Sequence, residues 1–279
     1  MMKLTLFVLL ILILVSPVGN SFSRAGQLQG QALAPSNLSP ADVDRIIRAF
    51  TAKETDFRKA LNEYTFKRDA VIQTIGIGGQ ISGEYRRVSH FVFDDKGARY
   101  EKVELSTMPT LRGLTMTPED LDDLGGIEPF ALEAGKMSRY NFTYAGRERI
   151  DELDLYMFDV SPKVMPNPKK SRERYFKGRV WVDDRDLQIV KARGKGVPEG
   201  AQRFPTFETY REEIDGHYWF PAYTYADESL QFPNGRVVHV RMRVRYTDFV
   251  RLRGKVRVTE ENIPGSVVKP SPTPAKPQP

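Results

Sequence analysis

The sequence predicts a mainly β protein with few helices: an up-and-down antiparallel sheet of about 10–11 strands that must curl on itself, preceded by one long N-terminal helix that lies on it. Three observations predict this fold. After one amphipathic helix, the spacing of the apolar residues changes from 3.6 to 2 and keeps that period over most of the chain. Short turn sequences separate the alternating runs. Strands do not alternate with helices, which argues against a doubly wound fold.

The residues before the helix are typical of export. Lys3 precedes an apolar run over residues 4–15, and small residues follow as far as Ala25. This pattern predicts a cleaved signal peptide over residues 1–25 and a periplasmic protein. The alternative is an uncleaved membrane anchor, but twelve helical residues span roughly 18 Å, against ~30 Å for the core of a bilayer.

Composition narrows the class of protein further. The chain has no cysteine, which excludes disulfides, thiolate metal sites, cysteine nucleophiles and lipid attachment at an N-terminal cysteine. A flexible spacer is expected over residues 26–38, one domain over 39–263 and a Pro-rich disordered tail over 264–279. The net charge of +6 is explained by a solvated basic sheet face and is compatible with an anionic membrane surface or an acidic partner, and we expect no nucleic acid partner.

The predicted helix begins at Ser39, with Pro40 in its first turn and Asp42 three residues after the cap. Apolar residues then recur at helical spacing up to about Asn62, with charged residues between them. The apolar positions are Ile46, Ile47, Phe50, Phe57 and Leu61. This pattern indicates a helix that lies on a sheet with its other side in water.

The predicted strands follow from Tyr64 onward, separated by turns rich in Gly, Asp and Asn. They cover 65–75, 81–94, 99–106, 140–150, 153–161, 173–183, 187–194, 207–214, 218–226 and 237–250. Ten runs joined by short turns indicate an up-and-down antiparallel sheet.

The strand pattern fails between residues 107 and 136. There Thr117-Pro118-Glu119-Asp120 predicts the start of a short helix that contains Leu121 and Leu124. This insertion is either a lid over the sheet or an ordinary surface excursion, and the sequence leaves both interpretations open.

The amount of apolar surface leads to a functional expectation. One helix covers two or three strands, so ten strands must curl on themselves, which leaves either a filled barrel or an apolar cavity. The predicted lining residues are Phe50, Phe57, Phe142, Tyr144, Val180, Val182, Trp219, Tyr223, Val240, Met242 and Val244. On the opposite face of the last strand, Arg241, Arg243 and Arg245 are candidates for binding a partner.

No group of residues predicts catalysis, and no metal or cofactor is expected. His90, His217 and His239 each lack a second ligand at a spacing typical of zinc sites. Residues 76–79 predict a hairpin rather than a dinucleotide fingerprint, and residues 183–186 predict a tight turn rather than a calcium loop.

Two short motifs resemble a known family. One is Gly178-Arg179-Val180-Trp181-Val182-Asp183 followed by a strand to Lys191, and the other is Asp215-Gly216-His217-Tyr218-Trp219-Phe220-Pro221. They resemble the outer-membrane lipoprotein-sorting proteins, the LolA-like family. The resemblance implies a half-open, curved sheet with helices on its concave side, and a hydrophobic cavity that takes up acyl chains of lipoproteins or lipids. Related folds sense lipoproteins or envelope stress.

Three hypotheses follow. The first is a non-catalytic periplasmic carrier of lipid or lipoprotein acyl chains in outer-membrane lipoprotein sorting, with inner- or outer-membrane transfer partners. The second is an envelope sensor or scaffold that binds a partner through its basic sheet face. The third is a periplasmic enzyme, which would need a buried polar cluster on the concave face.

Overall fold

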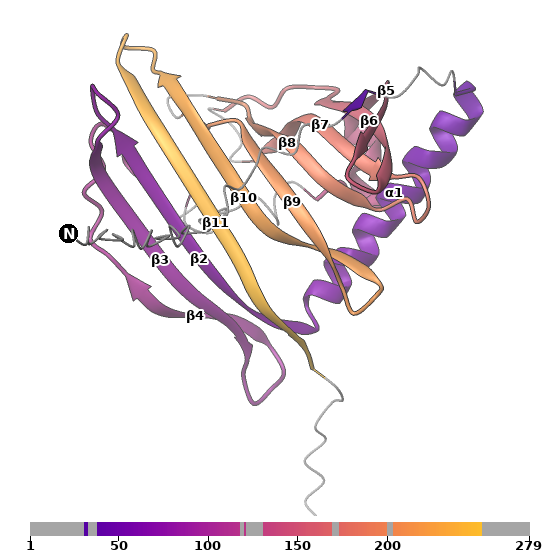
Figure 1. The fold of residues 1–279 in the computed structure, drawn as a ribbon, viewed down its shortest axis with the longest axis horizontal. Helices are drawn as coiled ribbons and strands as arrows, with labels where there is room; N and C mark the ends of the chain where they lie inside the picture. The colour runs from indigo at the N-terminus through magenta and orange to yellow at the C-terminus, as the bar shows by residue number, and fades with distance from the viewer. Residues whose placement is uncertain are drawn as a thin grey trace, which may run out of the picture.

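Figure 1 shows the fold of the chain in a computed structural model. The structure describes residues 31–32, 38–117, 120, 131–168, 173–199 and 203–252. The predicted signal peptide, most of the spacer and the Pro-rich tail lie outside the described residues, so these three predictions stay predictions.

The helix α1 (Pro40–Leu61) forms where the sequence predicts it. The Ser39 hydroxyl accepts a hydrogen bond from the Asp42 backbone N–H (3.2 Å) and donates one to the Asp42 carboxylate (2.7 Å), so Ser39 caps the helix. All five apolar residues of the predicted stripe are buried. The helix therefore uses this stripe to pack on the sheet.

All strands of the described residues belong to one antiparallel sheet in the order β1-β5-β6-β7-β8-β9-β10-β11-β2-β3-β4. The strands are β1 (Gln31–Ala32), β2 (Tyr64–Ile75), β3 (Ile81–Phe93), β4 (Arg99–Ser106), β5 (Tyr140–Ile150), β6 (Leu153–Pro162), β7 (Tyr175–Asp183), β8 (Ile189–Val197), β9 (Phe207–Ile214), β10 (Tyr218–Gln231) and β11 (Val237–Arg251). A short 3-10 helix, η1 (Ala134–Arg139), precedes β5. The first and last strands in this order do not pair, so the sheet is curved and half-open, and the predicted fold class is confirmed.

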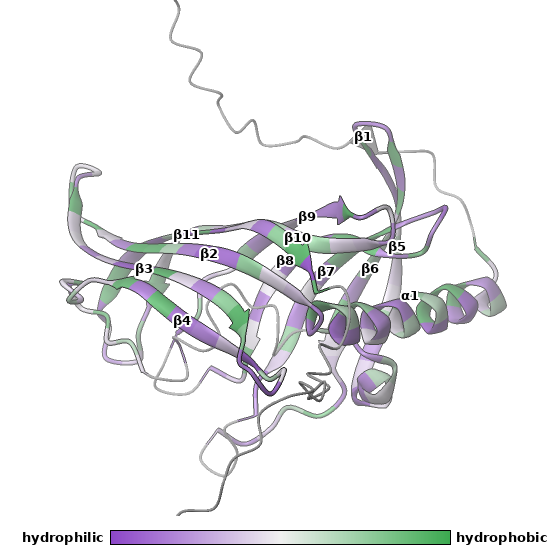
Figure 2. Cartoon of the chain, turned by 90° about the horizontal axis from the view of Figure 1, so that it is seen from below, coloured by the Kyte–Doolittle hydropathy of each residue, from purple (hydrophilic) through white to green (hydrophobic). Residues whose placement is uncertain are grey.

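We call the face of the sheet that α1 covers the inner face and the opposite face the outer face. Seen from the side in Figure 2, α1 underlies one part of the sheet, and β2, β3 and β4 extend beyond it. Two inner clusters of buried side chains follow from this arrangement. Cluster A consists of Phe57, Ala60, Leu61, Tyr64, Phe66, Ala70, Ile72, Tyr85, Phe220, Leu230, Val238, Val240, Val244 and Tyr246. Cluster B consists of Ile46, Ile47, Phe50, Leu132, Tyr140, Phe158, Val160, Phe176, Val180, Val182, Ile189, Phe207 and Ala226.

The helix joins the two clusters because it runs diagonally across the inner face. Its N-terminal half contributes Ile46, Ile47 and Phe50 to cluster B, and its C-terminal half contributes Phe57 and Leu61 to cluster A. On the sheet, Met242 of β11 packs against both clusters and is only partly buried. The apolar inner face is therefore continuous from β5 to β3.

The described residues between β4 and η1 (107–117, 120 and 131–133) form a segment that we call the strap. It first follows β3, where the Thr110 N–H donates to the Glu84 carbonyl (3.0 Å). Leu111, Leu114 and Met116 then pack against cluster A. At its far end Leu132 lies in cluster B, so the strap extends from one inner cluster to the other.

Candidate ligand-binding face

Nine of the eleven predicted lining residues lie on the inner face or on the helix that covers it. Phe57, Val240 and Val244 belong to cluster A, and Phe50, Val180 and Val182 belong to cluster B. Phe142 and Tyr144 are partly buried against cluster B, and Met242 contacts both clusters. These residues form one apolar surface because strands alternate their side chains between the two faces.

The structure corrects the placement of the other two predicted lining residues, because both lie on the outer face. Tyr223 pairs with Arg245, and residues that pair directly across two antiparallel strands share a face. Trp219 packs with a separate outer cluster of Ile150, Leu155, Trp181 and Val190. The inward positions of β10 hold Phe220, Thr224 and Ala226 instead, and all three are buried.

The strap contains inner-face residues that the sequence did not single out. Leu111, Leu114 and Met116 lie over cluster A, and Ala131 and Leu132 are buried. The only sequence feature that points to these residues is the pair Leu111 and Leu114, three positions apart. This spacing belongs neither to a strand pattern nor to a long helical pattern. Leu121 and Leu124, the predicted lid residues, lie outside the described residues.

Polar contacts fix the strap at its far side. Thr117 and Asp120 exchange reciprocal hydrogen bonds of 2.9 and 3.2 Å, so the predicted capping box is present. The Asp120 carboxylate also accepts a hydrogen bond from Arg174 (3.1 Å), whose guanidinium stacks on Phe204 at 4.6 Å. Beyond this point the Ala134 N–H donates to the Thr55 hydroxyl of α1 (3.0 Å). The strap is thus attached to β3, to the start of β7 and to α1.

A buried ion pair holds the helix to the inner face. The two Glu54 oxygens accept hydrogen bonds from both terminal nitrogens of Arg211 on β9, at 2.5 and 3.0 Å. The side chain of Glu54 is 3% exposed and that of Arg211 is 12% exposed. The Arg211 guanidinium also lies over the Phe57 ring at 4.6 Å, so the pair is enclosed by apolar groups.

A second polar group lies at the β2–β3–β4 end of the inner face. The Glu101 carboxylate accepts hydrogen bonds from Arg68 (2.7 Å), Arg87 (2.9 Å) and Ser89 (2.5 Å). Burial alone would raise the pKa of Glu101, but the hydrogen bonds from Arg87 and Ser89 and the charges of both arginines outweigh it and lower that pKa. The group is a satisfied network, which stabilises the edge of the sheet.

Tyr64 closes the junction between α1 and β2. Its ring meets Phe220 edge-on at 4.7 Å, and its hydroxyl donates to the Asp215 carboxylate at 2.8 Å. Burial of the ring, followed by the bond to Asp215, raises the pKa of Tyr64 to about 12. The hydroxyl therefore stays protonated at neutral pH and keeps this contact.

Several of the residues that carry the family resemblance meet on the outer face. The Lys191 ammonium lies 4.7 Å from the Trp181 ring and 5.0 Å from the Tyr210 ring. The Trp219 indole N–H donates to Asp186 at 3.0 Å, and the Gln188 amide donates both to Asp186 and to the His217 carbonyl. These contacts join the β7–β8 turn to the β9–β10 turn. These motif residues thus have a structural role on the outer face, whereas Val180, Val182 and Phe220 of the same motifs belong to the inner clusters.

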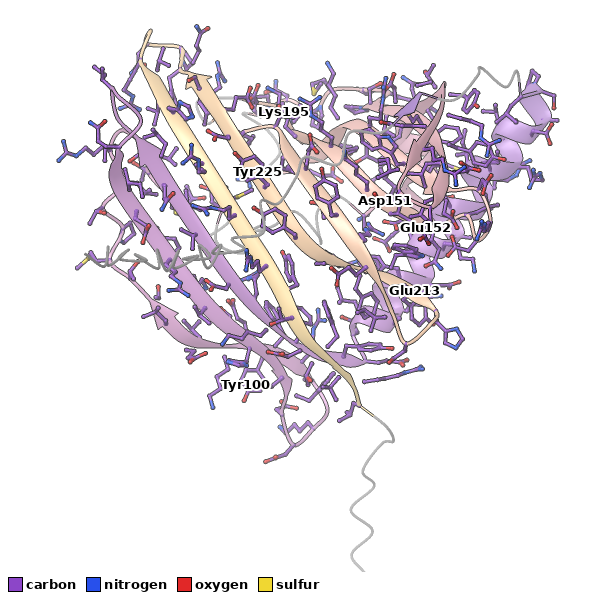
Figure 3. All side chains as sticks on the ribbon, viewed as in Figure 1. Tyr100, Asp151, Glu152, Lys195, Glu213 and Tyr225 are labelled. Atoms are coloured by element: carbon purple, nitrogen blue, oxygen red, sulfur yellow. The ribbon has the colours of Figure 1, made fainter. Side chains whose placement is uncertain are left out.

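The three candidate arginines of β11 lie on the outer face, as predicted, but they differ in their partners. Asp227 binds Arg241 (3.0 Å) and His239 (2.5 Å), and the hydrogen bonds to Asp227 outweigh its burial and lower its pKa. Arg243 and Arg245 are exposed, and no ion pair of theirs occurs among the described residues. Figure 3 labels Tyr225, which pairs with Arg243, and its ring stacks on Tyr223 with centroids 6.4 Å apart.

Two features that would indicate a function are missing from the described residues, a metal-binding group and a membrane-spanning helix. No group of three or more His, Asp or Glu side chains is arranged to hold a metal ion in this part of the chain. Among the same residues, no helix has the length and apolar composition to cross a membrane.

Comparison with known proteins gives matches only at the level of fold. No protein-family model matches the chain. No curated protein matches it either. Crystal structures with a similar fold include a DUF1329 family protein from Desulfovibrio piger, with 14% identity and a TM-score of 0.38 over 75% of this chain and 94% of that one.

Two further structures carry the family name that the motifs suggest. A LolA superfamily protein from Nitrosomonas europaea has 14% identity and a TM-score of 0.33, covering 73% of this chain and 94% of that chain. A putative outer membrane lipoprotein-sorting protein domain from Vibrio parahaemolyticus has 10% identity and a TM-score of 0.34, covering 74% and 94%.

Proposed function

We propose that the protein is a non-catalytic periplasmic carrier that binds lipid or lipoprotein acyl chains on its inner face, between the sheet, α1 and the strap. The observation that carries this proposal is the continuous apolar inner face, which spans the sheet from β5 to β3. Side chains at its centre and borders are only partly buried, among them Met242, Phe142 and Leu114. The family resemblance of the two motifs supports the same function.

The chemistry of the inner face suits an acyl chain. The burial of apolar surface is the main driving force for binding such a ligand, at roughly 25 cal/mol per Å² removed from water. Two charged groups of the inner face are paired, Glu54 with Arg211 and Glu101 with Arg87. The Glu228 carboxylate, opposite Val240, accepts a hydrogen bond from the Thr206 N–H at 2.6 Å. A ligand without strong polar groups therefore meets charges that already have partners at these positions.

Lipid extraction and native mass spectrometry of the purified protein test the proposal. We expect a co-purifying lipid and saturable binding of a fluorescent fatty acid. Met242→Trp fills the junction of the two clusters, and we expect it to weaken that binding about ten-fold. Ser229→Trp is the control, because Ser229 is exposed on the neighbouring strand and pairs with the outer-face residue His239. Equal binding by both variants, or no lipid at all, would contradict the proposal.

A second function, a sensor or scaffold, is favoured by Arg243 and Arg245. Both are exposed beside stacked tyrosines, in an arrangement rich in the Tyr and Arg side chains that dominate protein interfaces. Replacing both arginines with Glu is expected to abolish capture of an envelope partner and to leave fatty-acid binding unchanged. Loss of fatty-acid binding in this variant would link the two faces and contradict the separation of roles.

A further inference from the structure

Three segments meet at the end of the sheet where the two hairpin tips project (Figures 1 and 2). They are the β2–β3 turn region (75–83), the β10–β11 turn region (229–239) and the first part of the strap (107–116), and we call them together the rim. Register places Ile75 opposite His239. The Arg112 N–H of the strap donates to the Thr74 hydroxyl (3.1 Å), next to the first of these segments.

The rim exposes aliphatic side chains that no described residue covers. Ile77 at the hairpin tip is 101% exposed, Met108 83%, Val237 55% and Ile81 54%. A single exposed aliphatic residue on a surface needs no explanation, but four at one end of a sheet form a feature that marks interaction sites.

The charges of the rim have one sign. Its thirty residues contain no Asp or Glu, although 36 acids in 279 residues would give about four in a stretch of this length. Arg112 and Arg236 are both exposed, and the Arg236 guanidinium stacks on the Phe232 ring at 4.9 Å. Phe232 in turn packs against cluster A, as do Leu111 and Leu114 of the strap. The rim is therefore basic, and it is continuous with the apolar inner face.

From this combination we infer that the rim docks on the surface of an anionic lipid bilayer. The aliphatic tips enter the boundary between headgroups and acyl chains, and Arg112 and Arg236 meet lipid phosphates. A lipid surface fits better than an acidic protein, because three of the aliphatic side chains stand near the hairpin tips, the fourth lies on the adjoining strap, and no acid occurs in the rim. The inference goes beyond the proposed carrier function and does not require it, since docking is measured without any bound cargo.

The absence of cysteine allows a position-specific test on the full chain. Val237→Cys and Val250→Cys, each labelled with an environment-sensitive fluorophore, form a matched pair, because both valines lie on β11 and are 55% and 62% exposed at its opposite ends. With vesicles of phosphatidylglycerol and phosphatidylcholine, we expect a blue shift of the label at 237 and none at 250. Vesicles of phosphatidylcholine alone should give a weaker shift, and added salt should reduce it.

Further variants separate the contribution of the aliphatic side chains to docking from that of the arginines. Ile77→Glu, on the fully exposed tip, should lower vesicle affinity about ten-fold without changing thermal unfolding. Arg112→Gln and Arg236→Gln should each lower it roughly five-fold at low salt. An equal shift at 250, or no shift at 237, would overturn the inference. A shift at 237 that appears without vesicles when the protein concentration is raised would indicate contact with a second copy and would also overturn the inference. The same holds for a shift that soluble polyglutamate produces in place of vesicles.

Discussion

At the scale of single residues, the inner face combines apolar side chains with a buried ion pair between Glu54 and Arg211. Removing two charges from water costs several kcal/mol for each ion, and the cost is recovered only when the geometry is good. The bidentate contact between Glu54 and Arg211 has that geometry. The pair therefore fixes the position of α1 on β9 more than it adds to stability.

This leads to a prediction for the pair. Arg211→Ala leaves Glu54 buried without its partner and is expected to lower the free energy of unfolding by about 3–5 kcal/mol. The double variant Glu54→Leu/Arg211→Met removes both charges and should be close to the parent protein. Denaturant unfolding measures both. A small effect of Arg211→Ala would mean that Glu54 reaches water and that the helix is not closed onto the sheet.

Residues also explain where prediction from the sequence failed. Alternation along β10 separated two sets of side chains correctly but did not tell which set faces inward. Trp219 and Tyr223 are predicted to line the inside, but both lie on the outer face. The inward positions of β10 instead hold Phe220, whose ring packs on Phe57 of α1 with centroids 5.6 Å apart, and the buried Thr224 and Ala226. The side of the strand that faces the helix determines which residues are inside, and the alternation along a strand does not contain this information.

At the scale of elements, periodicity was enough for α1 and for most strands. The helix signal is strong because a serine N-cap and a 3.6 period coincide at Ser39–Leu61. The alternation in β11 is equally clear, with Val238, Val240 and Val244 buried and Arg243 and Arg245 exposed. The sequence of the strap shows only that the strand pattern is interrupted. Its position cannot be predicted, because it contacts distant strands and its apolar residues have no regular spacing.

The contact between the strap and β3 depends on one glycine. An added Cβ at Gly83 would lie 2.2 Å from the Thr110 carbonyl oxygen, so a side chain there forces the strap away from the sheet. Gly83→Ala is therefore expected to lower the free energy of unfolding by about 1–3 kcal/mol.

Gly135→Ala is the matched control for this prediction. Its Cβ would meet no atom within 4 Å, so it should change the free energy of unfolding by less than about 0.5 kcal/mol. Denaturant titration compares the two variants. If Gly83→Ala is as stable as Gly135→Ala, the strap does not lie against β3 at this point.

At the scale of the whole molecule, the sheet, α1 and the strap enclose the inner face from different sides. The ion pair Asp120–Arg174 holds the strap near β7, and its side chains are only 22% and 16% exposed. The proposed function implies that acyl chains enter past the strap. Removal of this ion pair should then speed the exchange of a bound fatty acid, with only a small loss in the free energy of unfolding.

Arg174→Met tests this relation, because it removes the charge and keeps an apolar side chain beside Phe204. An ion pair of this kind contributes about 1 kcal/mol, so the exchange rate of a bound fluorescent fatty acid should rise roughly five-fold. Arg179→Met is the control, since it removes the pair with Asp159, which has side chains 39% and 50% exposed on the outer face. Stopped-flow fluorescence measures both rates. Equal rates in the two variants would mean that acyl chains reach the inner face by a path that does not pass the strap.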